Sequence, residues 1–105
     1  MKYNVYETKD ILEFEKENNL CLEINERDAE MEAYTKCRYY VSFDNAEVKR
    51  IGVLTGASGN GNSVFEAVKE YCNEISKTTL VIGAYTDNRR EIRVPILTCK
   101  FGDYK

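Results

Sequence analysis

The segment Gly56-Ala57-Ser58-Gly59-Asn60-Gly61-Asn62-Ser63 concentrates the residues of this chain that could bind a ligand. An apolar stretch precedes it, and a pattern typical of an amphipathic helix follows it. Backbone N–H groups and the positive end of a helix dipole bind anions, and glycine lets a ligand approach the backbone without a Cβ in the way. The segment therefore predicts a site for a small phosphate-bearing ligand, formed by Gly56, Ala57, Ser58, Gly59, Asn60, Gly61, Asn62 and Ser63.

Two other interpretations of this segment remain open. Read as G-x-x-x-x-G-N-S, it resembles a Walker A loop in which Asn62 replaces the lysine. Because that lysine reaches the β- and γ-phosphates, its replacement argues against nucleotide hydrolysis. Glycine and asparagine also gather in turns for conformational reasons, and a capped helix needs no ligand.

The same residues resemble the pyrophosphate loop of the GNAT N-acetyltransferases, Q/R-x-x-G-x-G/A, with Gly56 in place of the Gln or Arg. The resemblance continues through the helix pattern at 64–72, the apolar run at 79–85 and Asn88, and it spans roughly residues 38–90. It implies a GNAT-like fold that binds acetyl-CoA or another acyl-CoA at the loop and Asn88, with N-acetyl transfer as the activity. Val94 and Pro95 occupy the region where the family commonly has a tyrosine acid, so the catalytic residues stay unassigned.

Composition excludes several kinds of chemistry. The chain has no histidine, which rules out Ser-His-Asp and Cys-His catalysis and histidine metal sites. Its four cysteines form no C-x-x-C pair, so we expect reduced thiols and no metal. A net charge of −3 and a pI near 5.1 argue against direct binding of nucleic acid.

A second function is compatible with these exclusions. The acidic run from Glu23 to Glu32 could contact a basic protein, and the eight tyrosines could contribute to a recognition surface. The alternative to an acyl-CoA-binding domain is therefore a catalytically inactive protein-interaction or inhibitor module of phage or mobile-element type.

The elements that must position the segment follow from periodicity. The strongest pattern predicts a helix that begins after Ser63, with Ser63 and Glu66 as a capping box and one buried stripe. That stripe consists of Val64, Ala67, Val68, Tyr71, Cys72 and Ile75. The continuous apolar run at 80–85 predicts a central strand covered on both faces.

The other predicted elements are a strand at 2–7, a helix at 9–19 capped by Thr8, a strand at 20–25, a loop or short exposed helix at 26–36, an antiparallel hairpin of 38–43 with 47–54 turning at Asp44-Asn45, and a strand at 92–96 that lies at an edge or breaks at Pro95. They predict one domain at 1–105 of the α/β (α+β) class: a single, mostly antiparallel six-stranded sheet with two helices, in the order β-α-β-β-β-α-β-β. The chain shows no membrane-spanning run or signal peptide, so we expect a cytoplasmic protein that does not bind membranes.

Overall fold

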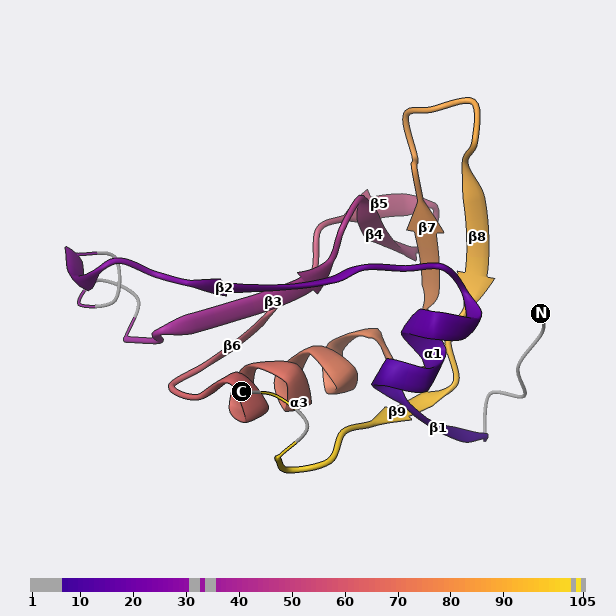
Figure 1. Ribbon diagram of the computed structural model, residues 1–105. Helices are drawn as coiled ribbons and strands as arrows, with labels where there is room; N and C mark the ends of the chain where they lie inside the picture. The colour runs from indigo at the N-terminus through magenta and orange to yellow at the C-terminus, as the bar shows by residue number, and fades with distance from the viewer. Residues whose placement is uncertain (1–6, 31–32, 34–35, 103, 105) are drawn as a thin grey trace.

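The computed structural model describes residues 7–30, 33, 36–102 and 104 and places them in a mixed α+β fold (Figure 1). Most of the predicted strand at 2–7, and residues 31–32 and 34–35 of the predicted polar loop, lie outside the described residues. The elements are β1 (Thr8–Asp10), α1 (Ile11–Glu17), β2 (Leu22–Glu26), β3 (Tyr39–Phe43), β4 (Ala46–Arg50), β5 (Val53–Thr55), β6 (Gly59–Gly61), α3 (Val64–Ile75), β7 (Thr79–Ile82), β8 (Arg90–Arg93) and β9 (Ile96–Thr98).

The predicted single six-stranded sheet is wrong, because the strands form three separate sheets. Their strand orders are β1-β9, β2-β3-β6 and β5-β4-β7-β8. Pairing is antiparallel in the two larger sheets and parallel between β1 and β9. In Figure 1, β2 and β3 run side by side away from the rest of the molecule, and α3 lies beside β6.

The predicted hairpin at 38–54 is also wrong, although both of its strands exist and the turn at Asp44-Asn45 is present. β3 is bonded by β2 on one edge and β6 on the other, so it has no edge left for β4. The second strand is itself a hairpin, β4-β5, which turns at Ile51 and Gly52 with φ of 50° and 76°. Positive φ at both central residues is the geometry of the commonest two-residue hairpin turn.

The prediction for residues 80–98 is confirmed in its main features, but β7 ends at Ile82, and Tyr85 at the end of the predicted run is exposed. β7 lies between β4 and β8, and its Leu80 and Val81 are buried on opposite faces. The strand that follows breaks at Pro95, since β8 ends at Arg93 and β9 begins at Ile96. Proline has no N–H for a ladder bond, which is why the chain leaves one sheet and joins another at that point.

The predicted buried stripe of α3 is confirmed, whereas the predicted N-cap of α1 at Thr8 is wrong. Ala67, Val68, Tyr71, Cys72 and Ile75 are buried on α3, and Val64 is half-buried beside them. The N-cap of α1 is Asp10, whose carboxylate accepts a hydrogen bond from the Leu12 N–H, whereas Thr8 belongs to β1. Ile11 and Phe14 of α1 are fully buried, so this short helix belongs to the core. Phe14 and Phe43 bring it against the inner face of β3.

Candidate functional site

The two inner glycines of the candidate segment belong to a strand. Gly59 and Gly61 lie in β6, opposite Val41 and Tyr39 of β3, and both face α3. A Cβ on Gly59 would lie 2.0 Å from the Ala67 carbonyl oxygen, and one on Gly61 would lie 2.6 Å from the Ala67 nitrogen. Such distances are far below van der Waals contact, so glycine at both positions is required for the strand to pack directly on the helix backbone.

Side chains of α3 accept hydrogen bonds from two backbone amides that the sequence suggested as anion ligands. The Asn60 N–H donates to Glu70 Oε1 at 3.2 Å, and the Asn62 N–H donates to Glu66 Oε2 at 3.0 Å. Ser63 caps the helix as predicted, since its hydroxyl accepts from the Glu66 N–H at 3.2 Å. Two carboxylates thus occupy the outer edge of β6, which is a common way to protect an edge strand from pairing.

A shallow hollow of about 400 Å³ lies beside these carboxylates. Its lining consists of Asn60, Gly61, Asn62, Glu66, Lys69, Glu70 and Asn73. An anion there would meet one ammonium and two carboxylates, so the local charge is negative. A negative site repels phosphate, which needs an excess of donors or cations.

The remaining predicted site residues lie apart from this hollow. Gly56 and Ser58 are exposed, Ala57 is half-buried against the core, and a Cβ on Gly56 would have no atom within 4 Å. Asn88 lies in the turn between β7 and β8, where its N–H donates to the Thr86 hydroxyl at 3.3 Å. The structure therefore brings Asn60, Gly61 and Asn62 together with α3, and Asn88 is not part of the lining of that hollow.

A cluster on the outer face of the three-stranded sheet was not predicted from the sequence. Arg27 donates to Asn60 Oδ1 at 2.6 Å and to the carbonyl oxygens of Cys37 and Tyr39, and its guanidinium lies 4.6 Å from the centre of the Tyr40 ring. One side chain thus ties the residues after β2 to both β3 and β6. Arg27 and Asn60 are 33 positions apart in the sequence, so no local pattern could predict this contact.

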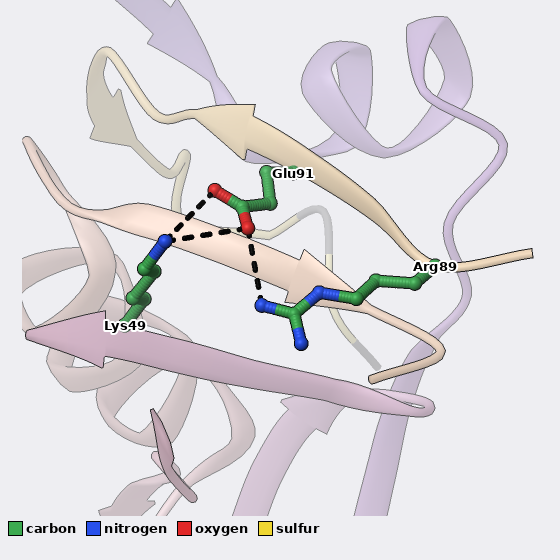
Figure 2. A network of polar contacts seen from close by, with 3 residues as sticks. All are labelled: Lys49, Arg89 and Glu91. Carbon is green, nitrogen blue, oxygen red and sulfur yellow. Dashed lines mark hydrogen bonds and ion pairs between the residues drawn. The ribbon is translucent and has the colours of Figure 1, made fainter. Parts of the chain in front are cut away.

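A second missed cluster lies on the four-stranded sheet. Figure 2 shows the Glu91 carboxylate of β8 above β7, between Lys49 of β4 and Arg89, which directly precedes β8. Lys49 Nζ lies 3.4 Å from Glu91 Oε2, and Arg89 Nη2 lies 3.1 Å from the same oxygen. The hydrogen bond from Arg89, with a smaller contribution from Lys49, lowers the pKa of Glu91. Glu91 is the cross-strand neighbour of Val81, which is fully buried on the face of β7 opposite to that of Leu80.

The outer edge of β2 differs from that of β6. The Arg27 N–H donates to the Arg38 carbonyl, and the Cys21 carbonyl accepts from the Asp44 N–H. Because backbone groups of an antiparallel strand alternate between its two edges, the odd-numbered residues of β2 bond to β3 and the even-numbered ones point outward. The Leu22 N–H is bonded by Glu15 Oε2 at 2.6 Å. Within the described part of the chain, the backbone groups of Ile24 and Glu26 on that edge have no partner.

Comparison with family models, with curated proteins and with solved structures finds no match to this chain. Among the described residues, no three or more Cys, Asp or Glu side chains gather as a metal site would require. No described helix has the length and apolar character needed to cross a membrane.

Proposed function

We propose that this protein is a catalytically inactive interaction module that binds an extended, basic segment of another protein along the edge of β2. The observation that carries this proposal is the pair of outward-facing backbone positions at Ile24 and Glu26, for which the described residues supply no hydrogen-bond partner. An extended peptide that adds a strand there would form main-chain hydrogen bonds, as in other complexes formed by β-augmentation.

The exposed side chains on this edge indicate the chemistry of the partner. Ile24 is 44% exposed and offers an apolar contact beside the outward-facing backbone groups. Four exposed residues in or after β2 carry carboxylates, namely Glu23, Glu26, Asp28 and Glu30, and that of Glu26 already pairs with Arg38 Nη2 at 2.6 Å. The nearby Arg27 is directed back onto β3 and β6 by its hydrogen bonds. A lysine- or arginine-containing strand would therefore be attracted to this edge, and opposite charges would set its register.

The acyl-CoA hypothesis uses a different part of the molecule, the glycine-rich segment. There Gly59 and Gly61 pack against α3, and Glu66 and Glu70 bond to two of the amides that a pyrophosphate would need. A titration with acetyl-CoA tests it separately, because a ligand that binds the native state raises Tm. Stabilisation by millimolar acetyl-CoA would favour the transferase-like function over the interaction module.

The test of the edge is a selection from a random peptide display library, followed by NMR titration of the selected peptides. We expect basic peptides of high β-propensity. Their binding should shift the backbone amides of Ile24 and Glu26 more than those of Glu23 and Asn25, which face β3. Binding should weaken with added salt, since the attraction between exposed charges is screened.

Matched variants separate loss of the edge from loss of the fold. Ile24→Pro removes an outward N–H that makes no ladder bond, so we expect it to fold and to lose peptide binding. Ile24→Val keeps the N–H and should bind as the native chain does. Selected peptides that leave the Ile24 and Glu26 amides unshifted, or that bind Ile24→Pro as tightly as Ile24→Val, would refute the proposal.

A further inference from the structure

The chain after β9 runs antiparallel to α3 and brings two cysteines together. The Leu97 N–H donates to Ser76 Oγ, just after the end of α3, at 2.9 Å. Further along, the ring of Phe101 lies 5.3 Å from that of Phe65 in the first turn of the helix. These two contacts fix the direction of the segment between them.

Cys99 and Cys72 lie between these two contacts. Cys72 precedes Ser76 by one helical turn, about 5.4 Å, and Cys99 follows Leu97 by two extended residues, about 6.6 Å, on the same side of the strand. These two distances are similar, and Leu97 lies beside Ser76, so we infer that Cys99 lies beside Cys72. Both residues line the same hollow, and burial together with the nearby Cys99 thiol raises the pKa of Cys72, which agrees with this placement.

Both cysteines line one hollow of about 300 Å³, which adjoins the one beside β6 and shares Lys69 and Asn73 with it. Its lining consists of Phe65, Lys69, Cys72, Asn73, Leu97, Thr98 and Cys99. Cys99 is half-buried, whereas Cys72 is only 2% exposed. A reagent that enters the hollow therefore meets Cys99 first, beside the ammonium group of Lys69.

We propose that this hollow is a thiol modification site, in which a small disulfide such as glutathione disulfide reacts with Cys99 and Cys72 then closes an intramolecular disulfide. Lys69 offers a positive charge to the carboxylates of such a reagent. Neither Cys72 nor Cys99 forms a disulfide in this structure, which is the reduced form of the site.

The reaction proceeds in two exchange steps. The Cys99 thiol loses its proton to solvent, and its sulfur attacks one sulfur of glutathione disulfide, which leaves Cys99 linked to glutathione and releases one glutathione as the thiol. Cys72 then loses its proton and attacks the Cys99 sulfur, which releases the second glutathione. Two protein thiols are oxidised and one small disulfide is reduced, as thiol–disulfide exchange requires.

The surroundings of the two thiols make the exchange slow at neutral pH. Burial raises the pKa of Cys72 and also that of Cys99, where the hydrogen bond from Cys72 and the charge of Lys69 partly oppose the effect of burial and of Asp10. The thiolate is the reactive form, so the initial rate should rise about tenfold from pH 7 to pH 8.

The test uses the full chain with Cys21→Ser and Cys37→Ser, so that only the paired thiols react. After incubation with glutathione disulfide, intact mass should fall by two hydrogen atoms, and peptide mapping should place the disulfide between Cys72 and Cys99. Adding Cys72→Ala, which keeps a small apolar side chain, should leave one stable glutathione on Cys99. Adding Cys99→Ser instead should leave Cys72 unreacted in the folded protein and reactive in urea.

Two further outcomes decide the proposal. A stable glutathione adduct on Cys99 while Cys72 is present, or equal reaction of Cys72 with and without Cys99, would overturn it. Lys69→Gln should slow the first step, and Lys69→Arg, which keeps the positive charge, should not. Each variant is compared by thermal unfolding, so that a change in reactivity caused by unfolding is recognised.

Discussion

Replacing Gly59 with alanine tests whether the glycines of β6 serve packing. The new Cβ would lie 2.0 Å from the Ala67 carbonyl oxygen, 2.4 Å from the Tyr71 nitrogen and 2.7 Å from the Tyr71 Cβ. Two of these atoms belong to the backbone of α3, so the strand and the helix must separate by more than about 1 Å before contact becomes normal. No rotamer change relieves the clash.

The expected cost is at the upper end of the range for overpacking, about 3 kcal/mol. Proteins of this size are stable by about 5 to 15 kcal/mol, so a large part of the folding free energy would be lost. Each 1 kcal/mol shifts Tm by about 4 to 8 °C in a domain of this size, which predicts a fall of about 12 °C or more. The substitution Gly59→Arg, which would leave the fold intact if Gly59 faced a ligand, must disrupt it for the same reason.

Gly56→Ala is the matched control, because a Cβ there meets no atom within 4 Å and the residue has no positive φ. We expect its stability to be unchanged or to rise by a few tenths of a kcal/mol, since alanine restricts the unfolded chain. Urea unfolding followed by circular dichroism measures both variants. If Gly59→Ala unfolds at the same midpoint as Gly56→Ala with an unchanged m-value, the packing explanation fails.

Four further predictions concern three residues, Tyr71, Ile51 and Glu91. The buried Phe43 N–H donates to the Tyr71 hydroxyl oxygen at 3.0 Å, and Tyr71→Phe leaves this N–H without that acceptor. The substitution should lower the free energy of unfolding, measured in urea, by about 1 to 3 kcal/mol. A loss near zero would contradict this assignment. Burial raises the pKa of Tyr71 to about 12, above its ordinary value near 10, so native stability should fall as pH rises from about 10 to 12, and Tyr71→Phe should lack that part of the fall. Ile51 is fully exposed at a φ of 50°. The substitution Ile51→Asn forms a favourable Asn-Gly turn with Gly52 and should raise the unfolding free energy by about 1 kcal/mol. A destabilised variant would show that the isoleucine makes contacts not accounted for. Glu91→Gln should lower Tm slightly at low salt and not at high salt, because its ion pairs are exposed; a loss independent of salt would require another cause.

The sequence predicted best those elements whose pattern depends on local geometry. In α3 the buried stripe and the Ser63 cap both repeat at helical spacing, so neighbouring residues carried the whole signal. The buried run of β7 and the break at Pro95 were likewise predictable, one from hydrophobicity and the other from a missing N–H. None of these predictions required knowledge of which strands pair.

Strand pairing was the part that local pattern could not supply. Residues 38–54 have the alternation and the turn of a hairpin, yet β3 pairs with β2 and β6 instead. The alternation of a strand shows which face is buried but not which neighbour it bonds. The true turn at Ile51 and Gly52 was obscured because isoleucine is rarely found at positive φ.

The glycine-rich segment shows that glycine can indicate either of two neighbours close to the backbone, a bound ligand or another part of the chain. Glycine is required wherever a backbone must come nearer than a Cβ allows, and the neighbour can be a phosphate or another backbone. At Gly59 and Gly61 the neighbour is α3, and at Gly56 nothing is near. Glu66 and Glu70 support the packing explanation, because a segment that offered its amides to an anion would not have two carboxylates bonded to those of Asn60 and Asn62. Those two glutamates repeat at helical spacing and looked like an ordinary solvated face, so only the antiparallel packing of β6 beside the helix reveals what they bind.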